Sequence, residues 1–163
     1  MVNYISGSHF NYCKFENFST DNGSCSNNYN DPDYIPCRGG ALDVNEIDLL
    51  ISNSSFINNS SQYGAAIKHT ECDIIFDNCY FRSNRGKTIY VKEVLCNYSG
   101  GNDEGSILFN SCTVENNEDF LFTGGNCNVG LEFIEFNDCL FDNNIGTLFN
   151  LNHHWGGNII FTN

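Results

Sequence analysis

Two groups of side chains in this 163-residue chain are of the types that perform acid–base chemistry or bind metal ions. Three cations, Arg82, Arg85 and Lys87, lie in one short segment, and Asp77 comes shortly before them. A basic side chain can abstract a proton from an acidic polysaccharide while Ca²⁺ holds the sugar. The second group consists of carboxylates, the oxygen ligands that Ca²⁺ prefers. Its members are Asp31, Asp33, Asp43, Glu46 and Asp48.

The spacing of these residues favours surface charge over a catalytic or metal site. The carboxylates lack the fixed spacing of a calcium-binding loop. We expect Arg85 and Lys87 to be exposed, without a converging pair of carboxylates. His153, His154 and Trp155 form one further cluster, but adjacent residues of a strand point to opposite faces. Nucleophile-elbow, P-loop and nucleotide-binding glycine patterns are absent from the sequence. We therefore predict no catalytic, metal-binding or cofactor-binding residue, and no enzymatic activity.

The charge balance narrows the range of partners. Seven Lys and Arg against 20 Asp and Glu give a net charge of −13 at pH 7. Nucleic acid is an unlikely ligand for such a chain, because its phosphates need a basic surface, and anionic membranes are disfavoured for the same reason. No apolar run approaches the ~18 residues of a membrane-spanning helix. The 27 asparagines and 15 glycines are also poor material for a helical bundle.

Cysteines and glycosylation sequons bear on the compartment. The nine cysteines include no Cys-x-x-Cys pair, so a structural zinc site is not expected. The first residues lack the basic and apolar segments of a secretory signal. Because asparagine is so frequent, Asn-x-Ser/Thr sequons arise by chance and carry little weight as a mark of secretion. The six sequons begin at Asn17, Asn22, Asn53, Asn58, Asn59 and Asn97.

An internal repeat organises the chain. Five segments align, 9–18, 50–59, 75–84, 108–117 and 135–144, and a sixth copy begins at 158–163. The first shared column is Phe10, Ile51, Phe76, Phe109 and Phe136. The second, three positions later, is Cys13, Ser54, Cys79, Cys112 and Cys139. The third column is Phe15, Phe56, Phe81, Val114 and Phe141, and the fourth is Phe18, Asn59, Asn84, Asn117 and Asn144.

A second motif, a glycine before a short apolar run, follows each copy. The first two instances are GGAL, with Gly39 and Gly40, and GAAI, which begins at Gly64. Later instances are GKTI at 86–89 and GTLF at 146–149, whereas the fourth copy has DFLF at 119–122 without a glycine. Each repeat therefore holds three short apolar runs separated by polar turns.

This arrangement predicts a β-solenoid. The Cys-x-Phe alternation has period two, so both columns face one side of a strand. One coil cannot bury its own apolar face, but stacked coils bury it together and hydrogen-bond ~4.8 Å apart. The last asparagine of each repeat is predicted to form a ladder at a tight turn, with its amide bonded to the next coil and its own backbone left-handed.

The cysteine column has two interpretations. Stacked cysteines form either disulfides or a redox stack, or they are small side chains that fill a narrow part of the core. Stacking leaves the Cβ vectors parallel, which is poor disulfide geometry, so packing is favoured. Cys25 and Cys37 bracket the first insertion and are the best candidates for a bridge in an oxidising compartment.

The pairing of GGA-[ILV] with F-x-x-N resembles the repeat of the chlamydial polymorphic membrane proteins, and similar repeats occur in surface proteins of protist parasites. The glycine motif matches at Gly39–Leu42 and Gly64–Ile67. The second motif matches at Phe56–Asn59, Phe81–Asn84 and Phe141–Asn144, with Val114–Asn117 as a variant. The resemblance implies a right-handed parallel β-helix that is displayed on a surface and is often adhesive.

We therefore predict one all-β domain over residues 1–163, a right-handed parallel β-helix of about five coils with surface insertions at about 19–37 and 94–105. Nothing in 145–163 resembles the polar or helical cap of a solenoid. This predicts that the chain is part of a longer β-helix or associates end to end through its C-terminal coil.

The predicted function is a non-enzymatic, adhesin-like interaction module at the cell surface or outside the cell, without a cofactor. Its ligand would be a host cell, a protein or a glycan. The alternative is a fragment of a carbohydrate-active β-helix, a polysaccharide lyase or hydrolase. Five coils at ~4.8 Å make a solenoid of only about 24 Å. That length is short for a polysaccharide groove and favours the interaction module.

Overall fold

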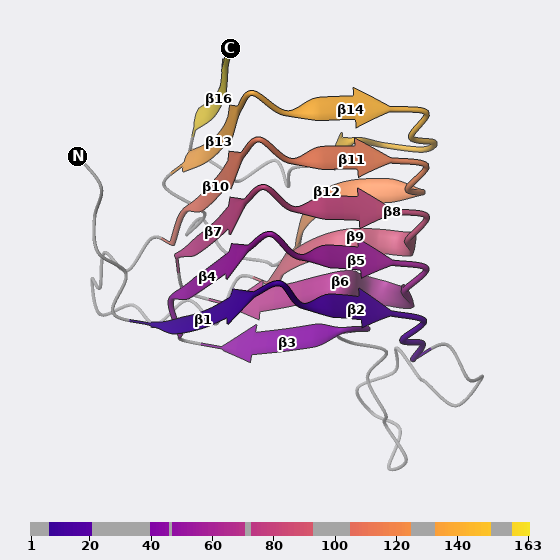
Figure 1. Ribbon diagram of the computed structural model, residues 1–163. Helices are drawn as coiled ribbons and strands as arrows, with labels where there is room; N and C mark the ends of the chain where they lie inside the picture. Colours follow the sequence, from indigo (N-terminus) through magenta and orange to yellow (C-terminus); the bar gives the residue numbers. More distant parts are fainter. Residues whose placement is uncertain are drawn as a thin grey trace, which may run out of the picture.

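The computed structural model describes residues 7–20, 40–45, 47–70, 73–92, 105–124, 133–150 and 158–163. These residues form strands and turns and no helix, and hence no apolar helix long enough to cross a membrane. Each of the five full repeats contributes one strand to each of three parallel sheets, and the partial sixth copy adds β16 to one of them. Figure 1 shows these strands stacked in chain order, an all-β arrangement consistent with a parallel β-helix or solenoid.

The three sheets are called A, B and C. Sheet A holds β1 (Ser8–Asn11), β4 (Leu49–Ser52), β7 (Ile74–Asp77), β10 (Ile107–Asn110), β13 (Phe133–Asn137) and β16 (Asn158–Thr162). Sheet B holds β2 (Lys14–Glu16), β5 (Ser55–Ile57), β8 (Tyr80–Arg82), β11 (Thr113–Glu115) and β14 (Leu140–Asp142). Sheet C holds β3 (Leu42–Asn45), β6 (Ser60–Thr70), β9 (Arg85–Lys92), β12 (Asp119–Gly124) and β15 (Phe149–Asn150).

The pairing register confirms the predicted columns. In sheet A, Phe76 pairs with Ile51 on one side and with Phe109 on the other. In sheet B, Phe81 pairs with Phe56 and with Val114. The partial sixth copy also follows the alignment, because β16 pairs with β13 in the same register. Spacing of like residues in the sequence therefore fixes which backbone groups meet between repeats.

Aromatic columns fill the core. Phe56 and Phe81 stack with ring centroids 5.1 Å apart and planes 5° from parallel. Phe76 and Phe109 stack in the same way in sheet A, at 4.9 Å. Between the sheets, Phe76 meets Phe81 edge to face at 5.2 Å. All four rings are fully buried. Offset stacks within columns and edge-to-face contacts between them are the two favourable aromatic geometries.

The predicted asparagine ladder forms at the corner between sheets B and C. Asn59, Asn84 and Asn117 are fully buried, and Asn144 is half-buried. Asn84 Nδ2 donates to Asn117 Oδ1 at 2.9 Å, and Asn59 Nδ2 donates to Asn84 Oδ1 at 3.1 Å. The ladder thus links successive repeats through buried amides, as predicted.

The position of the left-handed backbone was predicted wrongly. The ladder asparagines are not left-handed; the residue before each of them is. These residues are Asn58, Ser83, Asn116 and Asn143, with φ between 49° and 55°, and Asn17, with φ of 62°, is the equivalent residue before Phe18. The left-handed residue turns the chain outward, and the next side chain then points into the stack. Asn tolerates this conformation better than most residues.

The glycine motif is explained by chain length at the entry to sheet C. Leu121 pairs with Ile89, so the predicted alignment of DFLF (119–122) is wrong by one residue. Repeat 4 reaches its buried leucine with one residue fewer than its neighbours do. Gly86 and Gly146 accommodate the extra residue with φ of 80° and 78°. Repeat 4 lacks this left-handed residue and therefore needs no glycine.

Most of the two predicted insertions, 19–37 and 94–105, lies outside the described residues, as does Gly39. Gly40 is described, and its backbone N–H donates to the Gly64 carbonyl oxygen at 2.7 Å. A Cβ at Gly40 would lie 2.2 Å from the Ala65 carbonyl oxygen. This close approach of two backbones leaves no room for a side chain, which explains why residue 40 of the first glycine motif is glycine.

Candidate functional site

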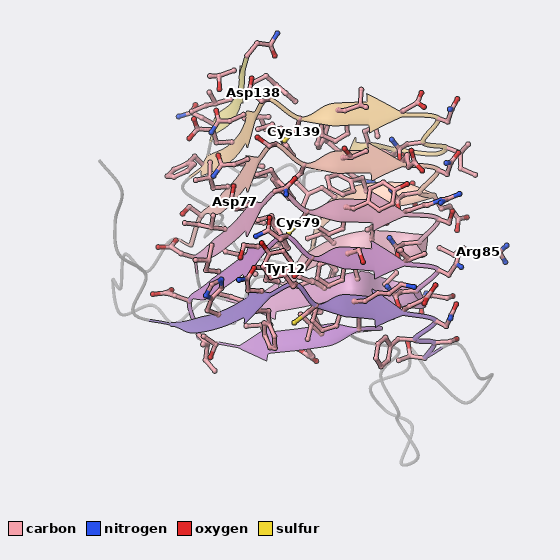
Figure 2. All side chains as sticks on the ribbon, in the orientation of Figure 1. Tyr12, Asp77, Cys79, Arg85, Asp138 and Cys139 are labelled. Carbon is pink, nitrogen blue, oxygen red and sulfur yellow. The ribbon has the colours of Figure 1, made fainter. Side chains whose placement is uncertain are left out.

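The cations that were weighed as a catalytic group do not assemble around Asp77. Asp77 ends β7 in sheet A, whereas Arg85 begins β9 in sheet C. Figure 2 shows Arg85 extended away from the stack, on the other side of the view from Asp77. Arg82 makes an ion pair with Glu115, with Nε and Oε1 3.3 Å apart. These side chains belong to separate parts of the outer surface, and Arg85 is exposed as predicted.

Lys87 differs from the prediction, because it is half-buried. Its Nζ lies 4.1 Å from the ring centroid of Tyr63 and 5.7 Å from that of Tyr90. Burial lowers the pKa of the Lys87 ammonium, and the Asp119 carboxylate acts in the opposite direction. Thr88 and Ile89 are adjacent and both buried, so the strand alternation is interrupted here and gave no signal for the partial burial of Lys87. An ammonium over two tyrosine rings is a cation–π arrangement.

Asp43 and Asp48, the two carboxylates of the candidate calcium group that lie in the described ranges, make separate contacts. Asp43 accepts a hydrogen bond from Lys68, whose side chain is almost fully buried. Asp48 instead accepts the backbone N–H of Asp73 at 3.1 Å and so connects two repeats of sheet A. No group of three or more His, Cys, Asp or Glu in the described ranges is arranged to hold a metal ion. Asp31, Asp33, Glu46 and 153–155 lie outside those ranges.

The cysteine column lies at the corner between sheets A and B, where Figure 2 shows Cys79 and Cys139 above one another. Its four cysteines are free thiols, and Cys79 and Cys112 are buried. Cys79 Sγ donates to the Ile51 carbonyl oxygen of the preceding repeat at 3.3 Å. Ser54 occupies the same column and donates to the Ser52 carbonyl oxygen at 2.6 Å. The column therefore supplies hydrogen-bond donors at the bend, in addition to the predicted packing.

Protonation is uneven along this column. Hydrogen bonding to Cys139 and Cys79, together with burial, raises the pKa of the central Cys112 thiol. The Cys112 thiol in turn lowers the pKa of the half-buried Cys139 to about 7. The five other cysteines, the predicted Cys25–Cys37 bridge included, lie outside the described residues.

The outer face of sheet A carries a column of apolar residues. Leu50, Ile75 and Leu108 are register partners in consecutive repeats and are partly exposed. Glu135 pairs with Leu108 and continues this column as an acidic residue. Asp77, two positions after Ile75 on the same strand, is exposed. We call this surface the sheet A face. It was not recognised in the sequence, although Leu50, an apolar residue at an outward position between Leu49 and Ile51, was a signal for it.

Charge separates the sheet A face from the rest of the stack. The six strands of sheet A contain no Lys or Arg. The six described cations all lie on strands of sheets B and C: Lys14, Lys68, Arg82, Arg85, Lys87 and Lys92. The strands of sheet A thus carry the carboxylates Asp77 and Glu135 beside an apolar column, and the described Lys and Arg residues belong to strands of the other two sheets.

Comparisons with protein families, with curated proteins and with solved structures found no match to this chain.

Proposed function

We propose that this chain is a right-handed parallel β-helix of about five coils that serves as a non-enzymatic, adhesin-like interaction module outside the cell. Successive repeats add their strands to the three parallel sheets in chain order, and this order supports a β-helix. Crossovers between parallel strands of one sheet are right-handed in the great majority of proteins, which supports the handedness. The resemblance of the repeat to polymorphic membrane proteins supports the surface location.

The sheet A face is the observation that carries the interaction module. Its centre is the apolar column Leu50–Ile75–Leu108, and the strands of sheet A also carry the carboxylates Asp77 and Glu135 and no Lys or Arg. Protein interfaces combine an apolar centre with a polar rim. Complementary charge accelerates association and selects the partner. The ligand proposed here is a host-cell protein with a cationic surface around an apolar patch.

Binding of the labelled protein to cultured animal cells tests this function. Ile75→Lys places a cation at the centre of the sheet A face, and Thr113→Lys places the same charge on the outer side of sheet B. Both positions are partly exposed strand residues, so the pair is matched in charge and context. Saturable binding that Ile75→Lys weakens at least about tenfold, a loss of about 1.4 kcal/mol, while Thr113→Lys leaves it unchanged, supports the proposal. Absent binding, or equal binding by both variants, contradicts it.

The cluster around Lys87 favours a second candidate, a carbohydrate-active β-helix. A lysine whose pKa is lowered by burial is suited to abstract a proton, and Tyr63 and Tyr90 beside it offer aromatic surface to a sugar. Incubation with acidic polysaccharides, followed by absorbance of the unsaturated product, tests this reaction. Activity lost in Lys87→Met and retained in Arg85→Ala would favour the lyase over the interaction module.

A further inference from the structure

The described residues contain four of the six sequons, and the structure separates them into two classes. Asn17 and Asn58 have exposed side chains, whereas Asn59 is completely buried and Asn53 is partly buried. Asn58 and Asn59 belong to overlapping sequons, so they are equal candidates in the sequence. An N-linked glycan is bulky and polar and must lie on the surface. The high asparagine content accounts for the number of sequons, but it does not explain why some of these side chains are exposed and others are buried.

The Asn59 amide is part of the ladder. Its Nδ2 donates to the Phe15 carbonyl oxygen and to Asn84 Oδ1, each at 3.1 Å. Its Oδ1 accepts the Phe18 N–H at 3.0 Å. A sugar on Nδ2 would replace one of these donors and would have no space between two repeats. A chain glycosylated at Asn59 cannot form the ladder.

The Asn53 amide is held in a second set of hydrogen bonds, at the corner between sheets A and B. Its Nδ2 donates to Asn11 Oδ1 at 3.1 Å, and its Oδ1 accepts from Asn78 Nδ2 at 2.8 Å. A glycan on Nδ2 would replace one of its two hydrogens and would crowd the Asn11 amide of the preceding repeat. Folding of a chain glycosylated at Asn53 would therefore disturb this set of hydrogen bonds.

Asn17 and Asn58 occupy equivalent positions in consecutive repeats. Both are left-handed residues, with φ of 62° and 53°, at the turn from sheet B to sheet C. The Asn17 N–H donates to the Ile57 carbonyl oxygen at 3.1 Å, which aligns the two turns. Because the next residue points into the stack, these two side chains point away from it. Figure 1 shows this turn on the side of the stack away from sheet A.

We propose that Asn58 and Asn17 are N-glycosylation sites and that Asn53 and Asn59 are not. In the reaction the amide Nδ2 forms a bond to the anomeric carbon of a lipid-linked oligosaccharide. The sugar–phosphate bond breaks, the lipid pyrophosphate leaves, and the amide loses one proton. The inference rests on the proposed extracellular location. A glycan at this turn leaves the sheet A face clear for a partner.

Transfer takes place on the unfolded chain, so Asn58 and Asn59 are both offered to the transferase, and folding then selects among the products. Two single substitutions separate the overlapping sequons. Ser60→Ala removes the sequon of Asn58 and leaves Asn59-Ala-Ser as a sequon for Asn59. Ser61→Ala does the reverse. The two variants are matched in chemistry and are adjacent in β6.

The experiment expresses the chain behind a supplied signal peptide in cultured animal cells. Peptide N-glycosidase and mass spectrometry then locate the glycans on the secreted, folded protein. We expect glycan on Asn17 and Asn58 in the wild type and in Ser61→Ala. In Ser60→Ala we expect loss at Asn58, retention at Asn17 and none at Asn59. Secreted protein without glycan at Asn17 and Asn58, or with glycan at Asn53 or Asn59, overturns the proposal.

Asn58→Asp covers the case in which a serine variant fails to fold, because Asp also tolerates a left-handed backbone. The expected result is loss of glycan at Asn58 alone, and a new glycan at Asn59 would overturn the proposal. The supplied signal peptide makes the site choice independent of natural export. Cell binding by Ile75→Lys is a separate measurement, so failure of the proposed function is distinguishable from failure of the glycosylation sites.

Discussion

The two corners that flank sheet B have the same backbone plan and different side-chain chemistry. At each corner a left-handed residue is followed by a side chain that points into the stack. At the corner between sheets A and B the left-handed residues include Asn53 and Asn78, and the inward side chains are cysteines or serine. At the corner between sheets B and C the inward side chains are the ladder asparagines.

The difference lies in how many backbone groups each side chain satisfies. Asn84 accepts the Asn59 N–H at 3.0 Å and donates to the Phe56 carbonyl oxygen at 3.0 Å. Cys79 donates through a weaker S–H group at 3.3 Å and longer, and its sulfur, a weak acceptor, accepts from the Cys112 thiol and the Ser54 backbone. Ser54 replaces cysteine within its column, whereas the ladder lacks asparagine only at Phe18. The ladder corner therefore holds the repeats together more strongly, whereas the cysteine corner is permissive.

Asn84→Ala is the strongest test of this comparison. The substitution leaves the buried Asn59 N–H and Phe56 carbonyl without partners, each at about 1–3 kcal/mol. We expect the free energy of unfolding in urea to fall by roughly 3–5 kcal/mol. Asn110→Ala is the control, because Asn110 accepts Asn137 Nδ2 in a partly exposed ladder at 3.0 Å. A loss below about 1 kcal/mol is expected there, and equal losses would contradict the comparison.

Gly86→Ala tests the backbone on the far side of the ladder corner. The glycine has φ of 80°, and a Cβ there would lie 2.2 Å from the Ser61 carbonyl oxygen. Strain of this kind costs about 1–3 kcal/mol, which thermal unfolding would detect. Arg85→Ala, at the exposed neighbouring position, should be within about 0.5 kcal/mol of the wild type. A neutral Gly86→Ala would show that the left-handed residue is dispensable in repeat 3, as it is in repeat 4.

Much of the fold was predictable because the same weak pattern of residues recurs in every repeat, and the copies support one another. Phe81 alone fits a helix or a strand, but Phe56, Phe81 and Val114 at matching positions require a shared register, which the structure has. The buried asparagine ladder was predictable for the same reason. A single buried Asn is costly, and a column of them has a partner in every repeat.

Other features depend on contacts that repetition does not encode. The left-handed residue precedes the ladder position, because the turn must end before the amide can point inward. Lys87 is half-buried because Tyr63 and Tyr90 lie beside it, and the extra residues of repeat 2 bring Tyr63 there. Of the candidate site, the sequence correctly indicated an exposed Arg85 and missed the Lys87 cluster and the sheet A face.

Cys79→Ser tests whether the cysteine corner tolerates a different side chain. Serine occupies this column at Ser54 and donates to the same kind of carbonyl oxygen. We expect the free energy of unfolding to change by less than about 1 kcal/mol. Cys79→Asp, which introduces a buried charge, is the contrasting variant and should be strongly destabilising. A loss for Cys79→Ser as large as for Asn84→Ala would show that both corners are equally strict.

The last prediction concerns the reactivity of the thiols rather than the stability of the fold. It distinguishes Cys139 from Cys112 within the cysteine corner. The pKa of Cys139 is about 7, below that of an ordinary thiol, because Cys112 donates to its sulfur. Alkylation by iodoacetamide requires the thiolate, so its rate at Cys139 should rise as pH increases through about 7 and then level off. Cys112, whose pKa is raised and whose side chain is buried, should stay unmodified in the folded protein.

Mass spectrometry of the alkylated peptides resolves each cysteine separately across a pH series. Cys112→Ala is the decisive variant, because it removes the donor and leaves Cys139 in place. The midpoint for Cys139 should then move upward, toward the roughly 8.5 of an unperturbed thiol. A midpoint that stays near 7 in Cys112→Ala, or alkylation of Cys112 before Cys139, would show that the stacked thiols do not control one another's protonation.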